Sequence, residues 1–310
     1  MNANEYKAMA AAYLAALPAA GKSPCTVKAY RNAADSFGAY LDGSGEDVSP
    51  LAVIGWRSAL AAVVGNNTTA HSMTILHALF AWANRNGLAE QNPVDVMEIP
   101  KHQRPDYDLL TLEEIETLLR GNAPRGINKK TSCRNRAIVI ILLQAGLRSD
   151  EVRSLTPADL DFENGAITVK HGKGDKRRTV PFPAIARAAM RDYLNSGYRP
   201  DGMNSNAVLF GTKAQNSSGA EAWAKLSSEA LRQLVRVYTG KACGHSVYPH
   251  ALRHAAASMW VSRGISMRDT QNALGHSSIL TTERVYVSIL DPRGTATKIN
   301  KAFDEAAETA

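Results

Sequence analysis

Six polar residues between positions 148 and 286 are of the types that can cleave a phosphodiester without a metal ion. Arginines and histidines can hold a phosphate, a lysine can protonate a leaving oxygen, and a tyrosine hydroxyl can act as the nucleophile. In chain order they are Arg148, Lys173, His250, Arg253, His276 and Tyr286. If the fold brings them together, they predict cleavage of a nucleic-acid strand with the broken bond kept as a phosphotyrosine.

The first two of these residues lie at predicted turns. Gly146 is expected to end a helix, and Arg148 follows it in the sequence AGLRSDEV. Glu151, three residues further on, falls on the same face of the next helical turn and can hold the guanidinium of Arg148. Lys173 lies between two glycines in HGKGDKRR, which predicts a basic β-turn with this lysine at its tip.

The remaining four residues lie in two motifs near the C-terminus. His250 and Arg253 are three residues apart in HALRH, so they share one face of a helix, whereas the adjacent His254 is expected to point into packing. His276 follows a predicted helix end in LGHSSILTTERVY, and Tyr286 closes that motif.

Taken singly, each motif has an ordinary structural interpretation. These interpretations are a surface ion pair at a helix start, a solvated hairpin turn, a packed His–Arg pair and a packed tyrosine. Their occurrence together, in this order, favours a shared active site.

Composition narrows the class of protein. With 45% hydrophobic and 21% charged residues in a chain of 310, the protein is of ordinary globular type, with room for two domains and no apolar run long enough for a membrane span. Glu5, Tyr6 and Lys7 favour an amphipathic first helix over a signal peptide. The three separated cysteines predict no disulfide framework and fit a reducing cytoplasm. The expected location is the cytoplasm of a prokaryote, in association with the nucleoid. Cys243, His245 and His250 offer only a weak alternative as a metal site.

The positive charge is unevenly distributed. Residues 1–100 hold 6 of the 36 lysines and arginines and 8 of the 29 acidic residues, a net charge of −2, so the remainder carries +9. The basic part, residues 101–310, predicts binding to a polyanion, most commonly nucleic acid.

The elements that must position these residues are mainly helices. A helical domain is expected over 1–92, a proline-containing linker over 93–108, and a second domain over 109–310. In the first domain, helices are predicted over 4–17, from Ser23-Pro24 to Leu41, over 50–64, and from after Asn67 to Gly87. In the second domain, Thr111 and Glu114 predict a capping box, and further helices are predicted over 131–146, 183–196, 219–240, 250–264, 266–274 and 292–308.

One segment of the second domain departs from the helical pattern. The sequence from Leu160 to Phe182 predicts three antiparallel strands, with an Asn-Gly turn at 164–165, a strand over Ala166–Lys170 and another over Arg178–Phe182. The predicted fold class is therefore mainly α, with a small three-stranded antiparallel sheet, in a chain of two domains.

The motifs together resemble the tyrosine recombinase, or phage integrase, family. The matching segments are GLRSDEV, GKGDKRRTVP, HALRH, LGHSSILTT and the final Tyr286, which span about residues 105–290. The resemblance is to Xer-like, two-domain members, in which the first domain is a SAM-like core-binding domain that contacts DNA. It implies that the two domains form a clamp around the DNA.

The resemblance implies a mechanism. Tyr286 attacks the scissile phosphate, leaving a 3′-phosphotyrosyl enzyme and a 5′-hydroxyl. The two arginines and His276 stabilise the transition state, Lys173 is the general acid and His250 the general base. Glu151 holds Arg148. Neither a metal ion nor ATP nor another cofactor is required, and strand exchange proceeds through a Holliday junction.

It also implies the partners. They are double-stranded DNA with inverted-repeat core sites and three further copies of the chain, in a tetramer held by the C-terminal helix over 292–308, without a membrane. Contacts to the DNA backbone are expected from Lys28, Arg31, Lys170, Lys176, Arg177 and Arg178. Because the helical domain begins within the first few residues, we expect no arm-site-binding domain and hence a simple system.

Other functions share parts of this pattern. A type IB topoisomerase uses the same chemistry on one duplex, an architectural DNA-binding protein keeps the fold without the reaction, and a relaxase-like nuclease would need a metal-binding histidine triad. The segment over 277–290 is expected to be mobile, with Tyr286 withdrawn from the arginines when DNA is absent.

Overall fold

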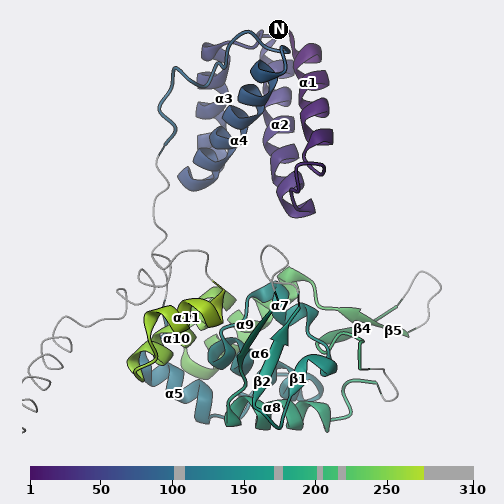
Figure 1. Cartoon of the computed structure of the whole chain (residues 1–310), viewed down its shortest axis with the longest axis vertical. Coiled ribbons are helices and arrows are strands. Elements are labelled where there is room, and N and C mark those ends of the chain that lie inside the picture. Colours follow the sequence, from purple (N-terminus) through teal and green to yellow (C-terminus); the bar gives the residue numbers. More distant parts are fainter. Residues whose placement is uncertain (101–108, 171–176, 201–204, 216–220, 276–310) are drawn as a thin grey trace, which may run out of the picture. The chain divides into compact units, whose positions relative to one another are not determined.

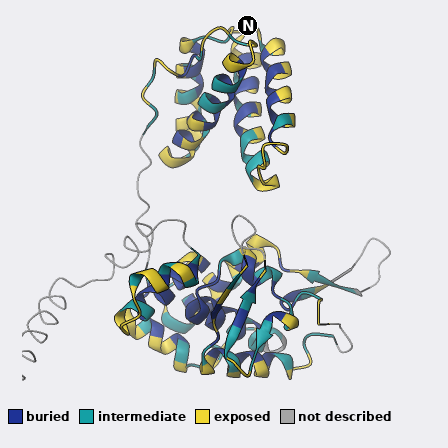
Figure 2. Cartoon of the chain, in the orientation of Figure 1, coloured by how far each residue is buried: buried dark blue, intermediate teal, exposed yellow. Residues whose placement is uncertain are grey.

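The chain divides into two compact units, residues 1–106 and 107–310. The computed structural model describes residues 1–100, 109–170, 177–200, 205–215 and 221–275 (Figure 1). In each unit the buried residues lie inside the packed elements and the exposed ones on their outer faces (Figure 2). Within the described residues, no helix is long and apolar enough to cross a membrane.

Unit 1 is a helical bundle. Its described elements are α1 (Ala3–Ala16), α2 (Pro24–Ser44), α3 (Pro50–Val63) and α4 (Asn66–Arg85), within a few residues of the predicted bounds. The side chains of Asn2, Ser23 and Ser49 accept hydrogen bonds at the starts of α1, α2 and α3, as N-cap residues do. Tyr6, Phe37, Trp56 and Phe80 form its buried aromatic core, and Val94 is buried with them.

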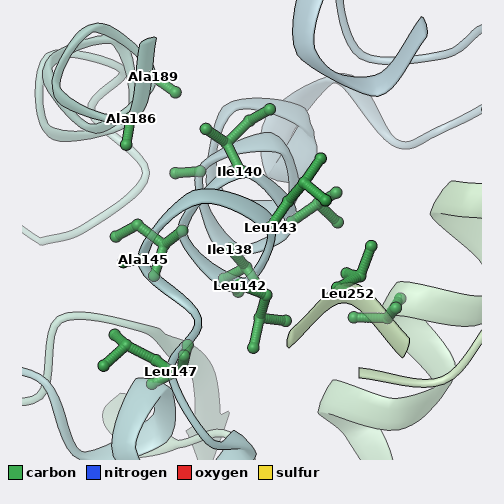
Figure 3. Packing of buried hydrophobic residues seen from close by; sticks show 14 of the residues in the cluster. Ile138, Ile140, Leu142, Leu143, Ala145, Leu147, Ala186, Ala189 and Leu252 are labelled. Atoms are coloured by element: carbon green, nitrogen blue, oxygen red, sulfur yellow. The ribbon is translucent and has the colours of Figure 1, made fainter. Parts of the chain in front are cut away.

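Unit 2 is built around the apolar helix α6 (Lys129–Ala145). Helix α8 (Ala184–Leu194) packs on one side of it through Ala186 and Ala189, and α10 (Pro249–Ser262) on another through Leu252 (Figure 3). Small side chains on α8 let the two helix backbones approach closely. The remaining helices are α5 (Leu112–Arg120), α7 (Ser149–Ser154), the 3₁₀ turn η1 (Pro157–Asp159), α9 (Ser228–Cys243) and α11 (Met267–Leu274).

The predicted three-stranded antiparallel sheet is present. Strands β1 (Leu160–Asp161), β2 (Ala166–Val169) and β3 (Arg178–Pro181) lie in that order, and Ile167 pairs with Val180. Gly165 has a φ of 64° in the turn between β1 and β2, a conformation that glycine adopts without strain. The mainly α fold class with a small antiparallel sheet is confirmed.

A second small sheet was not predicted. Strands β4 (Gly211–Gln215) and β5 (Glu221–Lys225) form an antiparallel hairpin, so the helix expected over 219–240 is wrong in its first part and begins at Ser228. The β5 sequence EAWAK has helix-forming residues, but tertiary contacts override this preference. The indole of Trp223 donates to the carbonyl of Val208 at 3.0 Å and lies so close to Gly211 that a side chain there would collide with it. The helix predicted over 292–308 lies outside the described residues.

Candidate active site

Arg148 is placed by a sharp turn after α6. Gly146 has a φ of 61°, and a side chain at this position would come within 2.7 Å of the Leu274 side chain and 3.3 Å of Trp260. Only glycine meets both demands, because its backbone tolerates positive φ and it adds no Cβ. The chain therefore turns directly into α7, with Arg148 as the residue that precedes the helix.

The predicted contact between Arg148 and Glu151 is present. Arg148 donates from its backbone N to Glu151 Oε2 at 2.7 Å and from Nη1 to Oε1 at 3.0 Å. Burial by itself raises the pKa of Glu151, but the hydrogen bonds from Arg178 and Arg148 outweigh it and hold that pKa below its ordinary value. Glu151 is thus a buried carboxylate that stays ionised and fixes the guanidinium of Arg148.

Arg178 does not lie where a DNA contact was expected. Its guanidinium donates to both oxygens of Glu151, at 2.7 Å from Nη1 and 2.8 Å from Nη2, and its Nε donates to the carbonyl of Ala273 at 2.9 Å. Only 13% of the side chain is exposed. No sequence pattern indicates this arrangement, because Arg178 follows Lys176 and Arg177 in a basic run that is typical of a solvated turn.

Helix α10 carries His250 and Arg253, which are the other described members of the six predicted active-site residues. Arg253 is buried and donates from Nη1 to the carbonyl of Gly146 and from Nη2 to that of Leu274 at 2.7 Å. Burial and the positive charge of Arg148 lower the pKa of Arg253, yet an arginine still carries its charge near neutral pH. The last turn of α11 is therefore joined to the turn that places Arg148.

His250 lies at the rim of the site, one helical turn before Arg253. The protein packed around its ring, followed by the charges of Arg253 and Arg148, lowers its pKa below the ordinary value of a histidine. A lowered pKa favours the neutral ring, the form that can accept a proton. His254 is buried, as expected, with its ring centroid 4.5 Å from that of His250.

Three guanidiniums converge on the C-terminus of α11. Arg178 donates to the carbonyl of Ala273, Arg253 to that of Leu274 and Arg148 to that of Gly275. These carbonyls have no partner within the helix and form its negative end, which favours cations. Gly275 ends the helix with a φ of 67°, directly before His276 in the sequence.

The other predicted residues fall into two groups. Lys173, Lys176, His276, Tyr286 and the segment over 277–290 lie outside the described residues. Lys170 forms an ion pair of 2.7 Å with the buried carboxylate of Asp159, which also accepts from Thr156, so Lys170 is held at the end of β2. Arg177 is exposed.

Basic residues of unit 1 gather at one place. Lys28 and Arg31, on α2, line a shallow hollow of about 360 Å³ together with Lys22. All three are exposed. The negative net charge of residues 1–100 therefore does not prevent a local cationic surface.

A further cationic surface beside His250 was missed by the sequence reasoning. A hollow of about 300 Å³ is lined by residues of α7 and α9 and of the start of α10, among them Ser149 and Arg232. The ring of Tyr248 lies against the guanidiniums of Arg232 and Arg236, with centroid distances of 5.7 and 5.4 Å. The four-residue spacing of these two arginines was the only signal, and it is common on surface helices.

The weak metal alternative gains no support from the arrangement of its residues. His245 Nδ1 lies 2.9 Å from Glu114 Oε1, and the Cys243 thiol donates to the Glu114 carbonyl. Across the part of the chain that the structure describes, no three His, Cys, Asp or Glu side chains are grouped so that they could hold a metal ion.

The buried His254 predicts a pH-dependent stability. Burial, followed by electrostatic interaction with the neighbouring His250 and Arg253, lowers its pKa from 6.5 to about 4. Between these values the unfolded chain binds more protons than the folded one, so the free energy of unfolding falls as the pH falls through this window. From this group we expect a loss of about 3 kcal/mol between pH 7 and pH 4.

Urea unfolding at a series of pH values measures this loss. His254→Gln should reduce the dependence by this amount, whereas the control His71→Gln, at an exposed position of α4, should keep it in full. An unchanged dependence in His254→Gln would show that His254 is not its source.

Comparison with known proteins identifies the family. The family model described as "Phage integrase family" matches residues 108–292. Tyrosine recombinase XerC of Oceanobacillus iheyensis is 29% identical over 272 residues, covering 84% of this chain and 85% of that protein. Tyrosine recombinase XerA of Pyrococcus furiosus is 32% identical over 232 residues, covering 75% and 72%.

A solved structure shows the same fold. It is the XerH site-specific recombinase bound to its palindromic difH substrate in a post-cleavage complex, which aligns with a TM-score of 0.67 and 22% identity over 89% of this chain and 80% of that one. The family model and the two recombinase relatives establish that the chain belongs to the phage integrase family of tyrosine recombinases.

Proposed function

We propose that the protein is a site-specific DNA recombinase that cuts and rejoins strands through a 3′-phosphotyrosyl intermediate and a Holliday junction. The observation that carries this proposal is the pair Arg148 and Arg253, held by Glu151 and by backbone carbonyls at the end of α11. Preorganised cations of this kind stabilise the charge that develops on a phosphate during displacement.

The reaction follows from the proposed roles. The hydroxyl of Tyr286 gives its proton to His250 as its oxygen bonds to phosphorus, and the bond from phosphorus to the 5′-oxygen breaks. Lys173 protonates that leaving oxygen, while Arg148, Arg253 and His276 hold the non-bridging oxygens. Attack by the 5′-hydroxyl of a partner strand reverses the step, so the chemistry needs no external energy source.

The lowered pKa of His250 supports its role as the base. A phenol has a reference pKa near 10 and is a weak nucleophile at neutral pH without a proton acceptor. A neutral imidazole at the rim of the site can take that proton, and burial together with the adjacent positive charges lowers the pKa of the ring and so favours its neutral form.

The two units are assigned different parts of the work. We assign DNA binding to residues 1–92, a connecting role to 93–108 and catalysis to 109–310. Lys28 and Arg31 in unit 1 and Arg177, Arg232 and Arg236 in unit 2 are suited to backbone phosphates, and Lys176 is assigned to them by its sequence alone. Such contacts weaken as salt rises, because counterions are released on binding.

A covalent trap tests the function. Nicked suicide duplexes from the native genomic neighbourhood of the gene are mixed with the protein, and products are separated under denaturing conditions. A protein–DNA adduct through a 3′-phosphate is expected, and its sequence would give the target site. Absence of an adduct on every duplex would contradict the proposal. Recombinant products from two sites, rather than relaxation of a single plasmid, distinguish a recombinase from a type IB topoisomerase.

We further propose that four copies assemble on two core sites through the helix predicted over 292–308. Ile299 and Phe303 are four residues apart and so share one helical face, which suits docking on a neighbouring protomer. Deleting residues 292–310, or replacing both residues with serine, should abolish tetramers on the trapped site and leave binding to a single half-site intact. Native gel mobility and mass photometry measure this, and wild-type tetramer formation by both variants would contradict it.

A further inference from the structure

Arg178 occupies a central place among the charged groups of the site. Each oxygen of Glu151 accepts two hydrogen bonds, one from Arg178 and one from Arg148. The two arginines therefore share one carboxylate, and Arg178 grips it with the planar two-pronged geometry that a guanidinium offers.

The same side chain also reaches α11. Its Nε donates to the carbonyl of Ala273, and its Cδ and Nε lie 3.2 Å from where a Cβ on Gly275 would be. Glycine at 275 thus leaves room for the Arg178 side chain. Arg178 joins β3, which leads away from the basic turn, to α7 and to the end of α11.

Arg148 and Arg178 differ in how much of each side chain is exposed to solvent. Arg148 has 28% of its side chain exposed, against 13% for Arg178, whose Nε and both terminal nitrogens already donate within the protein. A phosphate can approach Arg148 more readily than Arg178. The cation of Arg178 is directed at Glu151 and not at the solvent.

We propose that Arg178 is a positioning residue: by fixing Glu151 and the end of α11 together, it holds Arg148 where the scissile phosphate must bind. This rests on the proposed function and adds to it a residue that contacts neither the phosphate nor the nucleophile. Misplacing a catalytic group by about 1 Å can cost about 100-fold in rate.

The test separates cleavage from binding. The duplex trapped by the wild-type protein is used to measure the rate of adduct formation at saturating DNA, the Kd for that DNA and the salt dependence of Kd. For Arg178→Ala the saturated rate should fall about 100-fold, while Kd and its salt dependence stay at the wild-type values. Arg178→Lys should also be slow, about tenfold or more, because lysine keeps the charge and loses the two-pronged grip.

Two other arginines provide controls. Arg177→Ala, at the exposed position next to Arg178, should raise Kd and reduce its salt dependence, because it removes a contact with a phosphate of the DNA backbone. Arg120→Ala, at an exposed position of α5, should match the wild type in all three quantities. Melting temperatures of all variants identify any loss of folding, and Arg178→Lys keeps the test valid if Arg178→Ala does not fold.

A double-mutant cycle tests the route through Glu151. If Arg178 acts through this carboxylate, its removal should slow a Glu151→Gln protein much less than it slows the wild type. Full additivity would contradict the proposal, as would a wild-type saturated rate for both Arg178 variants. If Arg178→Ala raised Kd and Arg178→Lys restored it to the wild-type value, Arg178 would instead be a DNA contact. If the wild-type protein forms no adduct, the proposed function itself fails, which is a separate result.

Discussion

Replacing Tyr286 with phenylalanine is expected to abolish the covalent DNA adduct while leaving DNA binding intact. The change removes one oxygen, the atom proposed to bond to phosphorus, and leaves the cationic framework of Arg148 and Arg253 unaltered. No other group in the proposed mechanism can form a phosphotyrosine, so the loss should be complete within the detection limit of a denaturing gel. The measurement is adduct yield on the suicide duplex beside the Kd for the same DNA.

Tyr198→Phe is the matched control. Its hydroxyl accepts a hydrogen bond from Arg134 in unit 2, and it has no part in the proposed reaction. This variant should form the adduct at the wild-type yield. If Tyr286→Phe still forms an adduct, the nucleophile is another residue, and mapping the modified peptide by mass spectrometry would identify it.

Arg253→Lys is expected to lower the saturated cleavage rate about 10²- to 10³-fold, the usual cost of removing one preorganised donor from a transition state. The guanidinium donates hydrogen bonds to the carbonyls of both Gly146 and Leu274, and these two bonds fix its plane within a buried site. Lysine keeps a positive charge but cannot hold both carbonyls in that geometry and still present a donor to phosphate.

The same substitution should also reduce stability. A buried carbonyl left without its partner costs about 1–3 kcal/mol, so the melting temperature should fall by a few degrees. Arg263→Lys, at the exposed end of α10, is the control and should change neither quantity. Cleavage by Arg253→Lys at the wild-type rate would remove Arg253 from the proposed transition state.

The structural features that were predicted correctly are those that interactions between residues close together in the chain determine. Thr111 and Glu114 form the capping box that their spacing predicted, and the turn at 164–165 joins two antiparallel strands. Glu151 meets Arg148 because three-residue spacing on a helix is itself a contact rule. Each of these features depends on residues close together in the chain.

The predictions that were wrong or missing concern features that contacts between residues far apart in the chain determine. Arg178 lies 27 residues from Glu151 and 95 from Ala273, so no local pattern could distinguish it from the exposed Arg177 beside it. The strand β5 was read as helix because its pairing with β4 and the packing of Trp223 are tertiary effects. A buried arginine and a solvated one have the same sequence signature, since only the fold determines which carboxylate is near.

The three arginines at the end of α11 hold on to main-chain oxygens, and this determines how the site can change over evolutionary time. Every residue has a carbonyl, so exchanging the side chain of Ala273 leaves its hydrogen bond to Arg178 in place. A deletion or insertion in this turn would act quite differently. It would rotate the helix end by about 100° per residue and direct each carbonyl away from its arginine. The number of residues in the C-terminal turn of α11 should therefore be far more constrained than the identity of its side chains.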